Sequence, residues 1–209
     1  MDLNVDHLVY AVPDLEEGRD AIERLLGVRP AVGGRHPHLG SQNALLSLGP
    51  DVYLEVVAPD PGLPRPPRGV VFNMDGINRS YLSTWALRCE AIDDVAAQAA
   101  SRGFEVGPLL HGSRERPDGT MLTWRLSDPY LMAFDGIVPF LIGWGDSPHP
   151  ARSAPAAGKL MTLEARHPDA GGAAAALAAL GVDLPVRTGP APSLSARIQR
   201  VDDSVVTLQ

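Results

Sequence analysis

The sequence predicts an α+β protein built from repeated β-α-β-β-β units, whose mostly antiparallel and curved sheets form a cup. One unit recurs three times: a short apolar strand, a turn, an amphipathic helix, and a glycine followed by an apolar residue. The glycines that end the three helices, Gly27, Gly103 and Gly181, lie 76 and 78 residues apart. Strand-like sequence follows each helix. A repeat of this kind indicates the architecture, because neighbouring copies bury a shared core.

The first unit is expected at residues 1–61. Its elements are, in order, a strand at 6–12, a helix ending at 26, a weak extended stretch near Val32, and hairpin strands at 43–48 and 52–57. Asp14 directly follows a proline and is placed to cap the helix, since its carboxylate can accept a hydrogen bond from a free amide of the first turn. Gly27 then ends the helix, because glycine adopts the left-handed conformation without strain.

Two further units and two connectors follow. A proline-rich connector at 62–82 precedes the second unit at 83–145, and another at 146–158 precedes a shorter third unit at 159–209. The second unit is expected to contain a strand at 83–89, a helix from about 92, an extended stretch near Val106, and strands at 121–126 and 137–142. The third is expected to contain a strand at 160–166, a helix at 171–180, an extended stretch near Val186, and strands at 194–198 and 205–208. We expect the first two units to form the cup, while the third either flanks it or completes a second cup across a homodimer.

The composition of the chain indicates which kinds of partner and which cellular compartment to expect. The 209 residues carry a net charge of −7 and a sequence pI near 5.3. This argues against a nucleic-acid partner, because a phosphate backbone requires a basic face. The single cysteine, Cys89, cannot form an internal disulfide, so a cytoplasmic location is expected. No charged and then apolar leader opens the sequence, which predicts neither export nor a membrane anchor. A small molecule remains the expected partner.

Two polar residues stand out on strands that otherwise read as buried. Glu55 lies within the apolar run 52–58, and His7 shares a face of the opening strand with Val9 and Ala11. A buried carboxylate costs several kcal/mol unless it is paired or bound to a metal. Since the first and last strands of a curved unit can aim side chains into one concavity, His7 and Glu55 together make half of a divalent-metal site. The alternative is that both are ordinary strand residues, a satisfied histidine and a solvated glutamate.

Several short stretches form a further pattern. They are DHLVYAVPDL at 6–15, GGRHP at 33–37, NALL at 43–46, YLE at 53–55, and PFLIGWG at 139–145 running on to SPHP at 147–150. As a set, and over nearly the whole chain, they resemble the glyoxalase-like domain family of the vicinal oxygen chelate superfamily. The resemblance implies two units paired into a cup that holds a divalent metal (zinc, nickel, manganese or iron), with His7 and Glu55 among its ligands. Such a metal chelates neighbouring substrate oxygens and stabilises the developing oxyanion.

The sequence departs from the metal-dependent pattern in the other two units. The positions opposite His7 and Glu55 fall on Thr84, Trp85 or Ala86 and on Leu141, Ile142 or Gly143 in the second unit, and on Thr162 and on Leu208 or Gln209 in the third. None of these completes a ligand set. Completion requires another subunit or a loop histidine, from among His36, His38, His111 and His149. Otherwise His7 and Glu55 act as a metal-free pair, in which the glutamate orients the imidazole as a general base.

Five other residues are candidates for contacts with the substrate: Asn43, Trp85, Arg88, Trp124 and Arg125. A tryptophan could form an aromatic wall, and an arginine could hold a carboxylate through two hydrogen bonds. Because Trp124 and Arg125 are adjacent on a strand, at most one of them faces the cup. Two functions stay open. One is a lyase, isomerase or dioxygenase for a small molecule with vicinal oxygens, and the other is a protein that sequesters a small molecule without catalysis.

Overall fold

The first two units form one eight-stranded sheet in the computed structural model, which describes residues 4–115 and 121–209. The first unit comprises β1 (Val5–Ala11), α1 (Leu15–Leu26), β2 (Ala31–His36), β3 (Ser41–Ser47) and β4 (Tyr53–Pro59). The second comprises β5 (Tyr81–Arg88), α2 (Ile92–Ser101), β6 (Leu109–Glu115), β7 (Met121–Ser127) and β8 (Phe140–Gly143). The strand order is β2-β3-β4-β1-β5-β8-β7-β6, so the units meet where β1 and β5 pair antiparallel. The predicted pairing of units one and two is confirmed.

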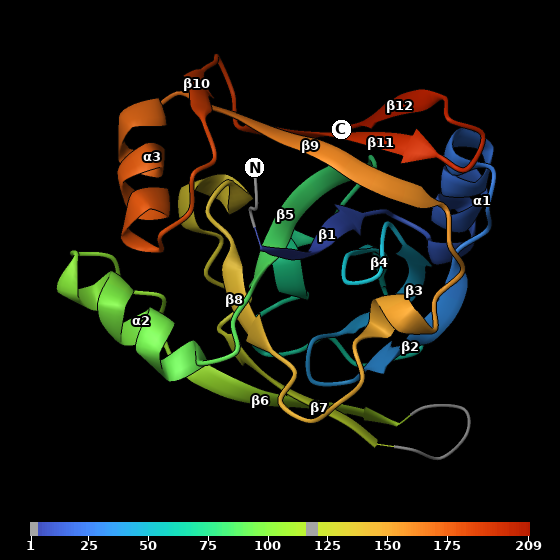
Figure 1. The fold of residues 1–209 in the computed structure, drawn as a ribbon. Helices are drawn as coiled ribbons and strands as arrows, with labels where there is room; N and C mark the ends of the chain where they lie inside the picture. Colours follow the sequence, from blue (N-terminus) through green and yellow to red (C-terminus); the bar gives the residue numbers. More distant parts are fainter. Residues whose placement is uncertain (1–3, 116–120) are drawn as a thin grey trace.

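The sheet curves until its two outermost strands, β2 and β6, approach each other (Figure 1). Arg114 of β6 lies against Gly33 and Gly34 of β2, where a Cβ on Gly34 would come within 2.5 Å of the arginine Cδ. The paired glycines therefore leave room for a side chain from the other unit. This close approach nearly closes the cup.

The predicted helix ends are confirmed. Asp14 accepts a hydrogen bond from the amide of Glu17, as predicted. At the start of the third helix, Asp169 likewise accepts one from the amide of Gly172. Gly27 and Gly181 follow the first and third helices at φ of 78° and 74°, in the left-handed region. The aspartate at the start of a helix and the glycine after its end are local signals, because a cap involves only neighbouring residues.

The second unit differs from the prediction at two strands. The extended stretch expected near Val106 begins later, since β6 starts at Leu109. The strand expected at 137–142 is shorter, because β8 starts only at Phe140. Pro139 has no amide N–H for a strand ladder, and residues 137 and 138 form the turn that follows the 3-10 helix η2 (Ala133–Gly136).

The third unit comprises β9 (Gly158–His167), α3 (Ala170–Ala179), β10 (Val186–Thr188), β11 (Ser193–Arg200) and β12 (Val205–Leu208). It has the predicted order of elements and its own four-stranded sheet. Its strand order, β10-β9-β11-β12, nevertheless differs from that of the first unit, β2-β3-β4-β1. The first strand lies inside this sheet instead of pairing with the last strand. The third unit therefore does not have the topology of half a cup.

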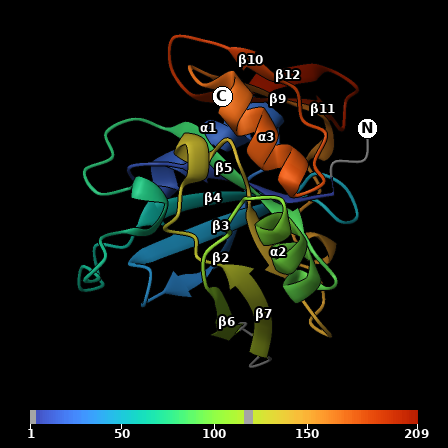
Figure 2. The ribbon, with the colours of Figure 1, turned by 90° about the vertical axis from the view of Figure 1, so that its left-hand side faces the viewer.

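The third unit covers the outer face of the eight-stranded sheet, the face that points away from the cup (Figures 1 and 2). Its inward-facing residues, which include Leu163, Leu194 and Ile198, share one core with Leu8, Trp85 and residues of α1. The amide of Leu160 also donates to the carbonyl of Leu48 at 3.1 Å. Of the two arrangements left open above, the structure thus shows a third unit that flanks the cup.

A second core fills part of the inner face of the sheet, the face inside the cup. Val9, Ala86 and Phe140 of the strands pack there with residues of the connector between the units. The connector contributes the short 3-10 turn η1 (Val71–Asn73), in which Phe72 has a left-handed φ of 57°. Such a conformation is strained for a bulky side chain.

Candidate functional site

His7 on β1 and Glu55 on β4 lie together on the inner face of the sheet. Nε2 of His7 is 3.7 Å from Oε2 of Glu55, and the two residues are 3% and 8% exposed. The parallel pairing of β1 with β4 brings them close, since Glu55 is opposite Val9, two residues beyond His7. The structure therefore brings together the two residues that the sequence analysis chose for chemistry.

This pair lines a cavity of about 70 Å³ inside the cup. Its other lining residues are mostly apolar or aromatic and come from both units and the connector, among them Leu39, Asn43, Tyr53, Phe72, Trp124, Phe140, Ile142 and Trp144. A water molecule takes up roughly 30 Å³ in the liquid, so the cavity has room for a few non-hydrogen atoms. It is far smaller than the roughly 300–1,000 Å³ of a pocket for a drug-sized ligand.

A third buried polar residue, Asp6, fixes the orientation of His7. The Nδ1 atom of His7 lies 2.8 Å from Oδ1 of Asp6. Adjacent strand residues normally face opposite ways, but the register of β1 with β5 shifts between Val5 and His7, so Asp6 is the extra residue of a β-bulge. Because an ionised carboxylate only accepts hydrogen bonds, Nδ1 carries the proton and the Nε2 of His7 faces Glu55.

Asp6 is not among the residues predicted from the sequence, and in the metal-free alternative Glu55 has the orienting role. That interpretation was incomplete, because the carboxylate bonded to the imidazole is the one next to it in the sequence. A signal was present, because Asp6 is a charged residue beside His7 in a strand that is otherwise apolar. The structure buries it fully. The bulge that turns it toward His7 has no local sequence signature, since it arises from pairing with β5.

The other oxygen of Asp6, Oδ2, accepts hydrogen bonds from the second unit and the segment after it. Trp144 Nε1 donates at 3.0 Å, Arg88 Nε at 3.4 Å, and Nε2 of His149 lies at 3.1 Å. Burial by itself would raise the pKa of Asp6, but the hydrogen bonds from His149 and His7 outweigh it and hold the pKa well below its ordinary value. Asp6 is therefore a buried anion whose two carboxylate oxygens both accept hydrogen bonds.

This arrangement makes the stability of the protein sensitive to acid. Because the pKa of Asp6 is lower in the folded than in the unfolded chain, its contribution to the free energy of unfolding is complete above about pH 4 and decreases as the pH falls further. We expect the denaturation midpoint to fall steeply below pH 4. The check is a series of urea unfolding curves between pH 2 and 7. An Asp6→Asn variant should show a shallower dependence in the same range, and equal slopes would contradict this role.

Glu55 is held by Asn43 of the adjacent strand β3. The Nδ2 of Asn43 donates to Oε1 of Glu55 at 2.5 Å, while its Oδ1 accepts the amide of Gly34 at 2.9 Å. The second bond fixes which end of the amide faces Glu55. One carboxylate oxygen is thus anchored, and the other is left to face His7.

Tyr53 covers one side of the His7 ring. The two rings are stacked with centroids 4.5 Å apart and an interplanar angle of 20°. Burial raises the pKa of Tyr53 well above its usual value, and the negative charges of Asp6 and Glu55 act in the same direction. Tyr53 is therefore neutral at physiological pH. It acts here as a wall that holds the imidazole plane in place.

The second unit repeats this backbone geometry without the polar side chains. His7 pairs with Tyr53 across β1 and β4, as Ala86 pairs with Phe140 across β5 and β8. The equivalents of His7 and Glu55 are therefore Ala86 and Ile142, two of the residues the sequence analysis considered for these places. Both are apolar and buried in the inner core.

The donor set does not fit a complete metal centre. Within residues 4–115 and 121–209, no three His, Cys, Asp or Glu side chains are grouped as metal ligands would be. His7 and Glu55 supply two ligands, whereas protein metal sites of this type use three or four. Of the four histidines considered above, His36 lines the cavity, His38 and His111 are exposed, and His149 is committed to Asp6. We therefore derive no chemical step through a metal.

The remaining candidate residues lie in different places. Trp124 lines the cavity, and its ring contacts Trp144 at 5.4 Å between centroids. Arg125 points the other way and forms a double ion pair with Asp93. Arg88 reaches Asp6.

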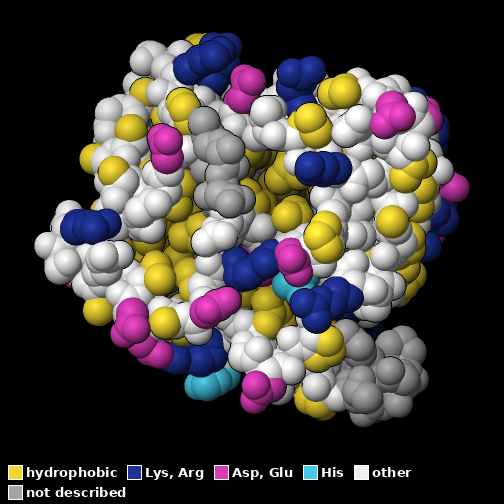
Figure 3. All heavy atoms as spheres, in the orientation of Figure 1, with side chains coloured by type: hydrophobic (Ala, Val, Ile, Leu, Met, Phe, Trp, Pro, Cys, Tyr) yellow, Lys and Arg dark blue, Asp and Glu magenta, His cyan; other side chains and the backbone are white. Residues whose placement is uncertain are grey.

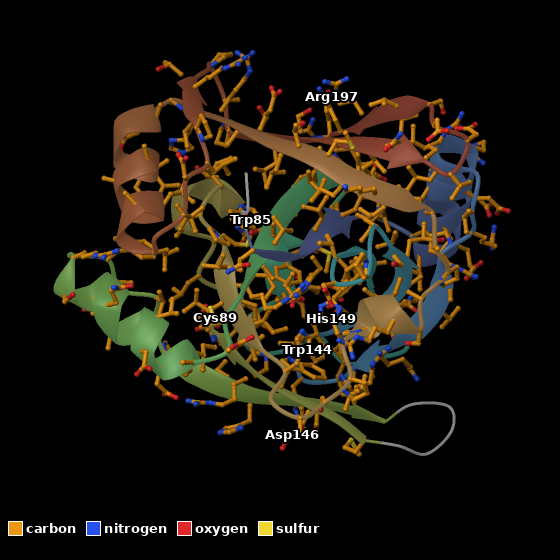
Figure 4. The ribbon with its side chains drawn as sticks, in the orientation of Figure 1. Trp85, Cys89, Trp144, Asp146, His149 and Arg197 are labelled. Atoms are coloured by element: carbon orange, nitrogen blue, oxygen red, sulfur yellow. The ribbon has the colours of Figure 1, made fainter. Side chains whose placement is uncertain are left out.

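Trp85 lies outside the cup. It is fully buried on the outer face of β5, under the third unit, and its Nε1 donates to the carbonyl of Ile137 at 2.9 Å. Figure 4 shows it on the opposite side of the central strands from Trp144 and His149. Among the described residues, therefore, Asn43 and Trp124 are the substrate-binding candidates that line the cavity.

Paired β-α-β-β-β units in one curved sheet, with His on the first strand and Glu on the last, define a protein of the vicinal oxygen chelate fold. The glyoxalase-like domain family matches residues 5–181. The chain belongs to this family. The match extends over both units of the cup and ends at the glycine that follows α3.

Solved structures with similar folds include a hypothetical protein from Staphylococcus aureus, with a TM-score of 0.67, 12% identity, and 98% of each chain covered. At this identity the likeness is one of fold alone, and it includes the third unit. Methylmalonyl-CoA epimerase from Mycobacterium tuberculosis has a TM-score of 0.45 and 17% identity, over 69% of this chain and 89% of that one. A methylmalonyl-CoA epimerase in complex with methylmalonyl-CoA and NH4+ has a TM-score of 0.48 and 15% identity, over 71% and 99%. No curated protein matches the sequence.

Two further observations concern the surface and possible partners. Among the described residues, the helices are too short or too polar to cross a membrane. On the face seen in Figure 3, basic and acidic side chains are interspersed. The described part of that face therefore carries no continuous basic stripe of the kind that binds a phosphate backbone.

Proposed function

We propose that this protein is a proton-transfer enzyme, an isomerase or lyase acting on a small molecule with vicinal oxygens. The observation that carries the proposal is a pair of facing acceptors. With Nδ1 protonated toward Asp6, a neutral His7 presents a lone pair to the Oε2 of Glu55, 3.7 Å away. Two lone pairs at this distance repel unless a proton, a water or a donor group of the substrate lies between them. The pair is therefore arranged to take up and release a proton.

In such a proton transfer, His7 can act as the base and Glu55 as the acid. Nε2 of His7 removes a proton from a carbon next to a carbonyl group, and the electron pair of that C–H bond moves to the carbonyl oxygen. The one proton that the pair holds between Nε2 and Oε2, on Glu55 when the substrate binds, then passes to the same or the neighbouring carbon, and the carbonyl re-forms. His7 ends with one proton more and Glu55 with one fewer, so a proton passing back between them restores the site. Such acid–base groups contribute roughly 10²–10⁴-fold each.

Asp6 suits this role as the group that orients the base. A buried carboxylate on Nδ1 holds the imidazole in one tautomer and stabilises the imidazolium that forms. The small, largely apolar cavity favours a compact substrate. The cytoplasmic location and the oligomeric state remain predictions from the sequence.

The test is solvent deuterium incorporation. We would incubate the protein in D₂O with a panel of small α-hydroxy and α-keto carbonyl compounds and follow their mass. For at least one compound, we expect the wild-type protein to catalyse exchange, and the His7→Ala and Glu55→Gln variants to lose about 10²-fold or more. His111→Ala is the matched control, because His111 is exposed on β6, away from the cavity. Equal exchange by wild type and His7→Ala would overturn the proposal.

The second candidate is a protein that sequesters a small molecule. This second candidate is favoured by Ala86 and Ile142, the apolar equivalents of His7 and Glu55, because the second unit offers no acid–base group at these positions. In that case some compounds would bind wild type and His7→Ala equally well by calorimetry, and none would exchange deuterium. A stoichiometric divalent metal, present in wild type and absent in His7→Ala, would instead contradict the metal-free mechanism.

A further inference from the structure

The segment that follows β8 reaches back into the first unit. Residues 144–149 contain Trp144, which the sequence analysis gave no role, and His149, which it considered only as a loop ligand for a metal. Both side chains turn toward the centre of the molecule (Figure 4), whereas Asp146, between them in the sequence, points to solvent. The proposed chemistry does not use Trp144 or His149 directly. Their position beside Asp6 suggests a different task.

His149 is fixed as a hydrogen-bond donor to Asp6. Its Nδ1 accepts the backbone amide of Ala151 at 3.3 Å, so the proton of the neutral ring must be on Nε2. Nε2 lies 3.1 Å from Oδ2 of Asp6. The short helical turn η3 (Pro150–Arg152) supplies that amide, so local backbone structure selects the tautomer. His149 is only 8% exposed, which keeps this bond away from solvent.

Trp144 and His149 both donate to Oδ2, and His7 alone donates to Oδ1. A carboxylate can rotate about its bond to the β-carbon, which would exchange the two oxygens or tilt Oδ1 away from the imidazole. Donors from two directions on Oδ2 oppose that rotation. They also satisfy an oxygen that would otherwise be buried without a partner, which is costly.

The same residues also contact His7 through packing. The ring of His149 meets Tyr53 edge to face at 5.5 Å, and Tyr53 stacks on His7 at 4.5 Å. Trp144 in turn meets His149 at 5.8 Å. His149 thus reaches the imidazole by two independent routes, one through the carboxylate of Asp6 and one through the ring of Tyr53.

We infer that Trp144 and His149 are positioning residues, which hold Asp6 with one oxygen on Nδ1 of His7 and so keep Nε2 aimed at the substrate. The inference rests on the proposed function, because it assigns a role within the same reaction. It adds that the base of the first unit works only with a segment that follows the second unit in the sequence.

The experiment compares two substitutions of one residue. His149→Phe keeps an aromatic ring against Tyr53 but removes the donor to Asp6, whereas His149→Gln keeps a donor and removes the ring. Nitrogen-15 NMR of the histidine side chains reports the tautomer of His7 directly. In the wild type we expect the Nδ1-protonated form to dominate. In His149→Phe we expect a second form protonated on Nε2, and a deuterium-exchange rate lowered about tenfold or more, the effect of one hydrogen bond to a charged group.

His149→Gln should largely restore the Nδ1-protonated form of His7 and the deuterium-exchange rate. His111→Phe, on the exposed face of β6, should change neither the tautomer nor the rate. A His149→Phe protein with an unchanged His7 tautomer and an unchanged exchange rate would overturn the inference, as would a His149→Gln protein as impaired as His149→Phe. The NMR result does not depend on finding a substrate. If no compound exchanges with the wild type, the proposed function fails, while the tautomer of His7 still tests the positioning.

Discussion

Replacing Asp6 by asparagine is expected to slow the proposed proton transfer about 10³-fold or more and to destabilise the fold by about 3 kcal/mol. An amide has one acceptor oxygen where the carboxylate has two. The structure presents Asp6 with donors from His7, His149, Trp144 and Arg88. If the amide oxygen faces Trp144 and His149, its NH₂ group faces His7 and forces the opposite tautomer. The lone pair is then on Nδ1, away from the substrate.

Two measurements separate the catalytic effect from the structural one. Urea unfolding gives the loss of stability, and exchange assays well below the unfolding midpoint give the rate of the folded protein. Asp183→Asn is the matched control, because Asp183 is exposed in the loop between α3 and β10. A folded Asp6→Asn protein with the wild-type rate would show that Asp6 has no part in the reaction.

Leu194→Asp is expected to have the largest effect on stability, about 4 kcal/mol or more. Leu194 of β11 is 3% exposed and lies in the core shared by the third unit and the outer face of the sheet. A carboxylate there has no partner and must be desolvated, which is among the most costly of single changes. Against a typical total of about 5–15 kcal/mol, most of the folding free energy would be lost.

Arg197→Asp provides the contrast on the same strand. Arg197 is exposed and points away from the molecule (Figure 4), so its replacement should change the stability by about 0.5 kcal/mol or less. The comparison is made by thermal and urea unfolding of the two variants. Equal midpoints would mean that the third unit is not packed against the cup as described.

Much of the fold follows from local signals in the sequence. Asp14 begins its helix, and Gly27 and Gly181 end theirs, as predicted, because capping depends on a few neighbouring residues. The order of elements in the third unit is also local. Its strand order is not, since it depends on which distant strands pair, and element order alone gave no reason to place β9 inside its sheet.

In the candidate site too, some features follow from local sequence and others depend on contacts between distant residues. His7 and Glu55 could be chosen from the sequence, because each is a polar residue on a strand that is otherwise apolar. Asp6 could not be paired with His7, because strict alternation places adjacent residues on opposite faces and only a bulge brings them together. His149 lies 143 positions from Asp6, and no spacing rule connects them.

Oδ2 of Asp6, in the first unit, accepts hydrogen bonds from residues far away in the sequence. The first unit should therefore not work as a separate fragment. The first β-α-β-β-β unit contains His7, Asp6, Glu55 and Asn43, and so looks like a self-sufficient module. Without Trp144 and His149, however, its central anion would lack two of the donors that hold it. The repeat that is visible in the sequence is therefore a unit of architecture, whereas the smallest working unit is the pair together with the segment that follows it.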